Sequence, residues 1–377
     1  MKYRNFTSID WKPSALGFGA MRFPIIDNDQ SKIDEEKAIK MIRYAIDHGV
    51  NYVDTAWPYH KEQSEILVGK ALKDGYRKKV KIATKLPSWL INKKEDMDYY
   101  LNKQLEKLQT EHIDFYLLHT LNREYWENYK KLDVFKWLEK VQKAGKIKYI
   151  GFSFHDKYDL FTEIVDYYDK WDFCQIQYNY LDTEFQAGKK GLKYAADRNL
   201  GVIIMEPLRG GLLAGEQPVD IQKIWQKSKI KRTAADWALQ WLWNQEEVSL
   251  VLSGMSTLKQ VKENVESTNS SAINSLTKKE LGLIKEVQKE YEKLSPITCT
   301  GCSYCVPCPN NVDIPENFDL YNHAHIYNSY EKQSKKYQAM DEKNRANQCI
   351  QCGECLDKCP QNLEIIELLA KVKDYFE

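Results

Sequence analysis

Two runs of cysteines near the C-terminus constrain this 377-residue chain more than any other feature. They read Cys299-Thr-Gly-Cys302-Ser-Tyr-Cys305-Val-Pro-Cys308-Pro and Cys349-Ile-Gln-Cys352-Gly-Glu-Cys355-Leu-Asp-Lys-Cys359-Pro, and together they hold eight of the nine cysteines. Closely spaced thiolates followed by a Cys-Pro pair are typical of iron–sulfur ligation. The spacing therefore predicts [4Fe–4S] clusters.

The second run matches the C-x2-C-x2-C-x3-C-P pattern of bacterial ferredoxins, in which the fourth cysteine ligates the other cluster of a pair. This rule predicts two clusters with crossed ligands. One set would be Cys299, Cys302, Cys305 and Cys359, and the other Cys308, Cys349, Cys352 and Cys355. The first run has only two residues before its last cysteine, but it too ends in Cys-Pro.

Zinc and disulfides are the alternative uses of these cysteines. Eight thiolates could form two four-coordinate zinc sites, although the Cys-Pro endings fit cubanes better. The chain starts with no apolar signal segment, so we expect a cytoplasmic protein, in which disulfides are rare. Clusters in such a small domain could also serve only to hold it together.

The composition gives no reason to expect a charged polymer as partner. Lysine plus arginine (55) nearly balances aspartate plus glutamate (54), so no net field attracts nucleic acid or an anionic membrane. The longest apolar runs, such as 113–118, are far shorter than the ~20 residues of a membrane-spanning helix. We expect a small-molecule substrate, with a redox partner protein as an open alternative and the oligomeric state undetermined.

Short β-rich runs alternate with amphipathic stretches between residues 14 and 270. We predict eight strands, at 14–19, 50–54, 80–84, 113–118, 147–152, 173–177, 201–205 and 249–252. Helices are predicted between them, at 34–48, 61–73, 95–109, 132–144 and 234–244. Eight such units predict an α/β fold, a closed (β/α)8 barrel, with an open doubly wound sheet as the alternative.

Glycines mark turns and close approaches in this pattern. Gly49, Gly145 and Gly201 stand near predicted helix ends, where a left-handed residue closes the last turn. Gly17 and Gly19 lack the third glycine of a dinucleotide fingerprint, so we expect them to permit close approach of the backbone to a ligand or neighbour.

The predicted domains are a barrel at 1–272, a helical linker at 273–297 and a ferredoxin-type domain at 298–377. The linker contains a charged helical stretch, 278–293, and Ser295-Pro296 is a plausible boundary. The segment between the two cysteine runs, 321–347, reads as helical and polar, so we expect the last domain to be mainly helical.

Four polar residues follow or end predicted strands: Asp54, Tyr59, Lys85 and His119. In a barrel, catalytic groups collect at the C-terminal ends of strands, and neighbouring strands lie about 4.8 Å apart. The four side chains can therefore converge on one small site. Taken singly, each has an ordinary structural role open to it, such as a rim aromatic, a loop cap, a solvated strand end or a core histidine.

These residues fall in an ordered series of motifs: Val53-Asp54-Thr55-Ala56-x-x-Tyr59, Lys85, His119, Gly151-Phe152-Ser153, Gln175-x-x-Tyr178-Asn179 and Ser253-Gly254…Glu263-Asn264. The series resembles the aldo/keto reductase superfamily over nearly all of residues 1–270, and the whole chain resembles the subgroup with a C-terminal ferredoxin-type domain. The resemblance implies that Tyr59 is the general acid, that Lys85 lowers its pKa, that Asp54 pairs with Lys85 and that His119 orients the carbonyl.

The resemblance also implies a nicotinamide dinucleotide. It places Ser153 and Gln175 on the carboxamide, residues 207–211 (Pro207, Leu208, Arg209, Gly210 and Gly211) around the pyrophosphate, and Ser253, Gly254, Glu263 and Asn264 near the adenosine half. The chain departs from the family at Phe154, after the serine, and at Met205, where an aromatic residue is common. Gln260 and Gly254 stand where cations often hold the 2′-phosphate, so NADPH and NADH both stay open.

Other residues are candidates for the substrate pocket, namely Trp57, His60, Trp89, Asn122 and Tyr125. His155 lies at the same mouth and could touch the substrate, although we expect a histidine on a surface loop. Cys174, in the sixth strand, is expected to be a buried core thiol.

Three functions are compatible with this combination. A nicotinamide delivers two electrons as hydride, whereas each cluster moves one. The first function is a carbonyl reductase whose iron–sulfur domain is structural or docks a partner. The second is an electron-transfer enzyme with a converter such as a flavin, which no motif indicates, and the third is a non-catalytic redox or regulatory protein on the same barrel.

Overall fold

The computed structural model describes residues 1–294 and 296–377. Two compact units are distinguished: Met1–Pro207 with Ala238–Leu276, and Leu208–Trp237 with Thr277–Glu377. Each is described by itself. The predicted domain limits at 272 and 297 stay a prediction, and Ser295 of the predicted Ser295-Pro296 boundary lies outside the described residues.

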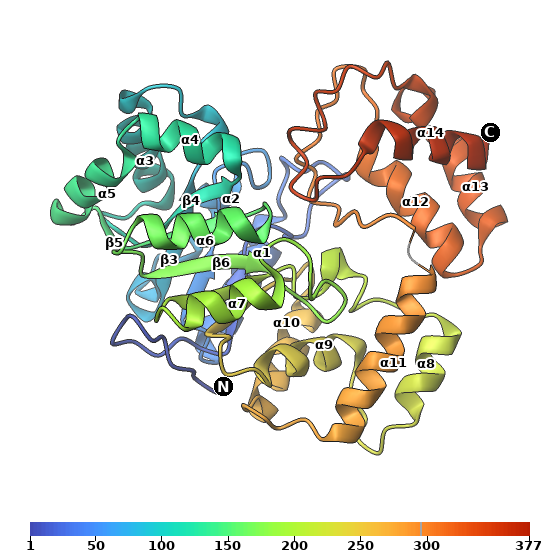
Figure 1. The fold of residues 1–377 in the computed structure, drawn as a ribbon, viewed down its shortest axis with the longest axis horizontal. Helices are drawn as coiled ribbons and strands as arrows, with labels where there is room; N and C mark the ends of the chain where they lie inside the picture. Colours follow the sequence, from blue (N-terminus) through green and yellow to red (C-terminus); the bar gives the residue numbers. More distant parts are fainter. Residues whose placement is uncertain (295) are drawn as a thin grey trace. The chain divides into compact units, whose positions relative to one another are not determined.

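The first unit contains a closed barrel of eight parallel strands in sequence order, as predicted. Figure 1 shows part of this barrel among its covering helices. The strands are β1 Leu16–Gly19, β2 Tyr52–Asp54, β3 Lys81–Leu86, β4 Ile113–Leu121, β5 Ile147–Phe154, β6 Phe173–Gln177, β7 Gly201–Met205 and β8 Leu250–Gly254. The open-sheet alternative is excluded, because β1 pairs with both β2 and β8.

Strands β3, β4 and β5 extend past their predicted ends. Beyond an irregularity after Leu118, Leu121 of β4 still pairs with Phe154 of β5. Lys85 and His119 therefore lie within strands rather than just after them. Lys85 pairs with Leu117 of β4, whereas His119 lies in the irregular stretch of β4 between Leu118 and Leu121.

Four covering helices of this unit begin and end close to predicted limits: α1 Glu35–Asp47, α2 Ser64–Ala71, α3 Lys94–Leu108 and α5 Val134–Lys143. Further covering helices, for which no limits were predicted, are α4 Arg123–Lys131, α6 Tyr158–Tyr167, α7 Gly188–Ala196 and α10 Leu258–Ser267. Helix α9, Ala234–Trp243, crosses the limit between the two units. Asp34 caps α1 by accepting a hydrogen bond from the Lys37 backbone N–H, which explains the start of that helix.

Two of the three predicted helix-end glycines are left-handed, with φ of 98° at Gly49 and 75° at Gly145. The prediction for Gly201 is wrong, because this residue begins β7 and the left-handed residue after α7 is Asn199, with φ of 60°. A Cβ atom at Gly201 would collide with the Phe6 ring. Gly17 is also needed for close packing, since a Cβ there would come within 2.8 Å of Leu250 and Leu252.

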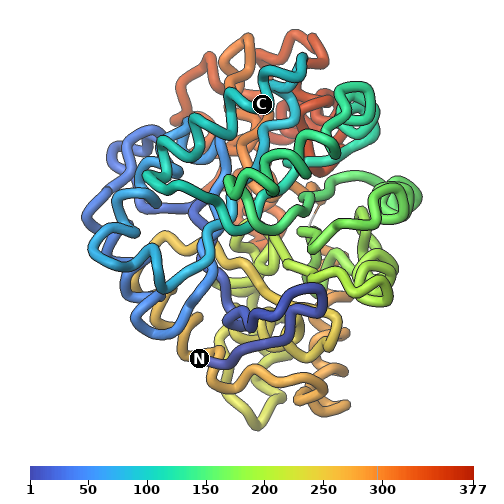
Figure 2. The backbone as a smooth tube through the Cα atoms, turned by 90° about the vertical axis from the view of Figure 1, so that its left-hand side faces the viewer, coloured from blue at the N-terminus to red at the C-terminus, as the bar shows by residue number. Residues whose placement is uncertain are grey.

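The N-terminal segment fills one end of the barrel interior. Its chain doubles back, with Tyr3 bridged to Ser14, and is traced by the dark blue tube in Figure 2. Phe6 is buried in a core cluster with inward-facing strand residues, including Tyr52, Phe115 and Phe173. These residues lie at the start of β2 and β6 and early in β4, so the segment closes the end opposite the strand C-termini.

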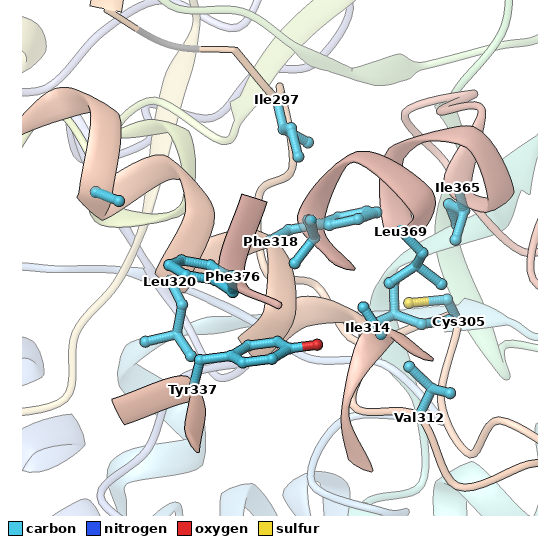
Figure 3. Close-up of a cluster of buried hydrophobic side chains, with 13 residues drawn as sticks. Ile297, Cys305, Val312, Ile314, Phe318, Leu320, Tyr337, Ile365, Leu369 and Phe376 are labelled. Carbon is cyan, nitrogen blue, oxygen red and sulfur yellow. The ribbon is translucent and has the colours of Figure 1, made fainter. Parts of the chain in front are cut away.

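The second unit is mainly helical, as predicted for the cysteine-rich region. It contains α8 Val219–Gln226, α11 Lys278–Leu294, α12 Ile314–Ile326, α13 Tyr330–Ala339 and α14 Ile365–Phe376. Figure 3 shows its core, in which Cys305 lies near Ile314 and Leu369. Phe318, Tyr337 and Phe376 form the aromatic part of the same cluster. The cysteine runs are thus anchored on an apolar core that joins α12, α13 and α14.

None of the helices in residues 1–294 and 296–377 has both the length and the apolar character needed to cross a membrane.

Candidate active site

Asp54 and Lys85 form a buried ion pair at the C-terminal ends of neighbouring strands. The Lys85 Nζ lies 2.5 Å from Asp54 Oδ1 and donates a second hydrogen bond to the Thr55 carbonyl oxygen at 2.8 Å. Both side chains are almost fully shielded from solvent. Burial raises the pKa of Asp54 and lowers that of Lys85, and each partner opposes the shift of the other.

Tyr59 lies beside this pair, in the loop after β2. The Lys85 Nζ is 3.5 Å from the Tyr59 hydroxyl and 5.1 Å from the centre of its ring. A cation this close stabilises negative charge on the phenol oxygen. The phenol is therefore placed to give up a proton, with Lys85 as the compensating charge.

His119 completes the group from β4. Its ring centre is 6.3 Å from that of Tyr59 and 5.2 Å from that of Trp89. Burial, followed by the Lys85 and His155 charges, holds the pKa of His119 well below its usual value. The imidazole is therefore neutral near pH 7. It can orient a polar group by hydrogen bonding, but it is not a proton donor of the imidazolium kind.

A buried polar network behind Lys85 was not predicted. Thr84 and Gln104 donate hydrogen bonds to Glu65 Oε1 at 2.6 and 2.9 Å, and Gln104 also donates to the Lys85 carbonyl oxygen at 2.8 Å. Tyr116 donates to Gln104 Oε1 at 2.8 Å. A signal was available, because Glu65 and Gln104 stand among the apolar positions of two predicted helices.

Ser153 and Gln175 are paired neighbours on β5 and β6. The Ser153 hydroxyl accepts a hydrogen bond from the Thr120 N–H at 2.7 Å. Gln175 is buried, and its Oε1 has no hydrogen-bond partner among residues 1–294 and 296–377. A buried acceptor of this kind is costly unless a ligand satisfies it, and the N–H2 group of a carboxamide would do so.

The predicted adenosine residues follow β8. Asn264 donates a hydrogen bond to the Ser253 hydroxyl at 3.0 Å, and Glu263 lies 3.7 Å from Lys259. Gln260 caps α10, since its Oε1 accepts hydrogen bonds from the N–H groups of Ser256 (2.8 Å) and Thr257 (3.2 Å). Its carbonyl oxygen is therefore committed to the helix rather than to a ligand.

Arg22 is a second residue that the sequence did not single out. Its side chain covers Gly254, where a Cβ atom would come within 3.2 to 3.4 Å of three Arg22 side-chain carbons. Its guanidinium lies 3.9 Å from Glu206. The Arg22 side chain therefore places a cation beside Gly254, although the residue at position 254 is itself uncharged.

The predicted pyrophosphate residues are divided between the units. Pro207 ends a segment of the first unit, two residues after Met205 ends β7, whereas Leu208, Arg209 and Gly211 begin a segment of the second.

Two of the residues predicted to line the substrate pocket instead make hydrogen bonds to nearby backbone groups. His60 accepts a hydrogen bond from the Phe23 N–H at 3.0 Å and contacts the Gln30 carbonyl oxygen at 3.2 Å. Asn122 caps α4 by accepting from the Tyr125 N–H at 2.9 Å. Each therefore stabilises a loop or a helix end.

Two further candidate residues, Trp57 and His155, have side chains that pack against other parts of the protein. Trp57 packs against Tyr100 and lies under Lys107, at 3.4 Å from Nζ to the ring centre. His155 is partly buried rather than exposed, and burial lowers its pKa to about 4. Its Nδ1 lies 3.3 Å from Gln186 Nε2, and Cys174 is buried as expected.

Cysteines of the two C-terminal runs lie close to one another. Burial raises the pKa of Cys305, and the nearby thiolates that add to this are Cys302, Cys299 and Cys359. Burial also raises the pKa of Cys355 to about 11, with Cys349, Cys308 and Cys352 as its neighbours. Those four line one pocket together with Cys305. Cysteines of both runs therefore meet in one place, and their thiols are the donors that an iron–sulfur cluster requires.

In the described parts of the chain, 1–294 and 296–377, no group of three or more His, Cys, Asp or Glu side chains is arranged so that it could hold a metal ion.

The chain thus has a (β/α)8 barrel with a tyrosine, a lysine, an aspartate and a histidine gathered at its strand ends, where barrel enzymes carry their active sites. The model of the aldo/keto reductase family matches residues 15–289, and that of the 4Fe-4S dicluster domain matches residues 298–364. The chain belongs to the aldo/keto reductase family and carries a C-terminal 4Fe–4S domain. It is an oxidoreductase.

The chain aligns with most of the length of two curated relatives. The NADH-specific methylglyoxal reductase of Escherichia coli is 27% identical over 308 residues, which are 69% of this chain and 90% of the relative. The L-galactose dehydrogenase of Arabidopsis thaliana is 28% identical over 306 residues, 75% of this chain and 91% of the relative.

Solved structures agree with the barrel. The aldo-keto reductase AKR11C1 from Bacillus halodurans, in its holo form, has a TM-score of 0.62 and 26% identity, covering 76% of this chain and 96% of its own. An aldo/keto reductase from Klebsiella pneumoniae in complex with NADP and acetate has a TM-score of 0.60 at 22% identity, over 76% and 95% of the two chains, and shows the fold alone.

Proposed function

We propose that the protein is an NAD(P)H-dependent reductase of aldehydes or ketones, with Tyr59 as the general acid. The observation that carries the proposal is the placement of the Lys85 ammonium 2.5 Å from Asp54 and 3.5 Å from the Tyr59 hydroxyl. A phenol beside a buried ammonium is a proton donor whose product, the phenolate, is stabilised where it forms.

A bound reduced nicotinamide would supply a hydride to the carbonyl carbon. Tyr59 would donate its proton to the carbonyl oxygen, so the carbonyl becomes an alcohol and the phenolate is left beside Lys85. The two electrons of the hydride form the new C–H bond, and the proton of Tyr59 forms the new O–H bond. Asp54 would keep Lys85 in place, because it is the closest carboxylate to the ammonium.

His119 would orient the carbonyl as a neutral hydrogen-bonding group. Its lowered pKa supports this role, since an imidazolium beside Lys85 would place two cations together in a buried site. Trp89, 5.2 Å from the His119 ring centre, would form part of the substrate wall.

Several residues would hold the nicotinamide dinucleotide. The unpartnered Oε1 of Gln175 supports a carboxamide contact, with Ser153 beside it. Pro207, Leu208, Arg209 and Gly211 would contact the pyrophosphate, and Ser253, Gly254, Glu263 and Asn264 the adenosine half. Because Gln260 is committed to its helix cap, we propose that Arg22, over Gly254, is the cation that would meet a 2′-phosphate.

We further propose two [4Fe–4S] clusters, held by the two crossed groups of cysteines. The groups support a structural role, because each would join segments far apart in the chain to one core. Electron exchange with a redox partner protein would need a converter between hydride and single electrons.

The test is consumption of NADH and NADPH by anaerobically reconstituted protein, offered methylglyoxal and a panel of small aldehydes and ketones. We expect consumption that depends on the carbonyl compound. Spectra of the same protein would separate the other functions, because bleaching of the clusters by NAD(P)H indicates electron transfer and a flavin band would name the converter. Absence of any carbonyl-dependent consumption would overturn the proposal.

A further inference from the structure

The segment after β7 is held by the iron–sulfur region of the second unit. Residues 208–217, here called the β7–α8 loop, run from the start of that unit to the beginning of α8. The loop starts with a short turn, Arg209–Gly211, in which Gly210 is left-handed with φ of 64°. Arg209 is buried. Three separate contacts fix the loop to residues near the cysteines.

The first contact is between two backbones. A Cβ atom at Gly210 would collide with the Thr300 carbonyl oxygen and would lie 2.9 Å from its carbonyl carbon. Only glycine allows this approach, since it also relieves the strain of the positive φ. Thr300 stands between Cys299 and Cys302, two residues assigned above to one cluster. The turn of the loop therefore rests on the backbone of the first cysteine run.

The second and third contacts are made by tyrosine hydroxyls. Tyr327, at the end of α12, donates a hydrogen bond to the Glu216 carbonyl oxygen at 2.6 Å. Tyr291, buried on α11, donates to Gln217 Oε1 at 2.8 Å, and the Gln217 amide in turn donates to the Gly215 carbonyl oxygen at 3.0 Å. The far end of the loop is thus tied to two helices that flank the first cysteine run.

We propose that the iron–sulfur domain positions the dinucleotide-binding loop of the reductase, with Thr300, Tyr327 and Tyr291 as positioning residues. This inference rests on the proposed function, in which Leu208, Arg209 and Gly211 contact the pyrophosphate. Because cluster binding orders the run that contains Thr300, cluster assembly and dinucleotide affinity are coupled. The domain then contributes to a hydride-transfer enzyme without any electron passing through it.

The test compares Tyr327→Phe with Tyr330→Phe, both as cluster-loaded full-length protein. Tyr330 lies on α13 with a half-exposed side chain, packed by its ring against Tyr375, and is the matched control. Dissociation constants for NADH and NADPH are measured by fluorescence titration, and hydrogen exchange of residues 208–217 by mass spectrometry. Loss of one hydrogen bond predicts that Tyr327→Phe raises the dissociation constant about 3- to 10-fold.

Amide exchange in the loop should rise in Tyr327→Phe, and the KM for the dinucleotide should rise with little change in kcat at saturation. Tyr330→Phe should match the wild type. Equal affinity and equal exchange in all three proteins would overturn the inference while leaving the proposed function intact. If the wild type binds neither NADH nor NADPH, the proposed function fails and the inference fails with it.

Discussion

Lys85 and Asp54 form an ion pair of 2.5 Å inside the barrel, and the same ammonium lies 3.5 Å from the Tyr59 hydroxyl. One buried cation is thus shared between a carboxylate that holds it and a phenol that it can activate. Neither carboxylate nor ammonium is solvated, so the pair depends on its own geometry.

Tyr59→Phe should lower kcat by about 10²-fold or more while leaving NAD(P)H affinity unchanged, because it removes only the proton donor. Stopped-flow measurement of carbonyl-dependent NAD(P)H oxidation checks the rate. Tyr99→Phe, at a side chain that is 55% exposed, is the control and should match the wild type. A Tyr59→Phe enzyme with more than about a tenth of the wild-type rate, when chemistry is rate-limiting, would exclude Tyr59 as the acid.

Lys85→Met should destabilise the barrel by about 3–5 kcal/mol, because it leaves the Asp54 carboxylate buried without its partner. Combining it with Asp54→Asn should restore much of the lost free energy of unfolding, since no unpaired charge is then buried. Turnover should stay low in both variants. Denaturant unfolding and kinetics on the same samples check this, and a double variant as unstable as Lys85→Met would contradict the pairing.

Gln175→Leu should weaken NAD(P)H binding by about 3- to 10-fold without lowering the melting temperature, because the Oε1 it removes has no partner within the described residues. Fluorescence titration and thermal unfolding are the two measurements. Gln142→Leu, at a partly buried side chain that donates a hydrogen bond to the Lys148 carbonyl oxygen, serves as the control. Unchanged affinity in Gln175→Leu would remove this residue from the cofactor site.

Crossed ligation predicts which cysteines fail together. Cys299→Ala and Cys359→Ala should lose the same cluster signal in electron paramagnetic resonance, and Cys308→Ala should lose the other. Cys174→Ala, in the barrel, should keep close to eight irons per chain. If Cys359→Ala loses the same signal as Cys308→Ala, ligation is local to each run and the crossed assignment is wrong.

His155 predicts a loss of stability in mild acid. Burial lowers its pKa to about 4 in the folded state, against about 6.5 when unfolded. Between these values the unfolded chain binds a proton that the folded chain excludes. The contribution, up to about 3 kcal/mol, is therefore complete above pH ~6.5 and lost as the pH falls toward 4. The melting temperature of His155→Gln should depend less on pH than that of the wild type. His48→Gln, at an exposed position, is the control and should show the pH dependence of the wild type.

Local sequence patterns were enough to predict much of the fold of this protein. The alternation of eight strands with helices predicted the closed barrel, since period and length depend on nearby residues alone. The cysteine spacing predicted the 4Fe–4S domain, which the family model matches at residues 298–364. Asp54, Lys85 and His119 could be named because parallel strands bring their C-terminal ends to one rim.

Long-range packing decided the rest. Gly201 was misassigned because the reason for its missing Cβ, the Phe6 ring, lies nearly two hundred residues earlier in the chain. The Glu65–Gln104 network, the burial of His155 and the commitment of Gln260 to a helix cap depend on which faces meet. The β7–α8 loop grouped with the cysteine-rich region for the same reason. The sequence by itself determined the strands, the helices and the types of side chain at the candidate sites. Tertiary contacts decided which polar groups are buried, paired or left open to a ligand.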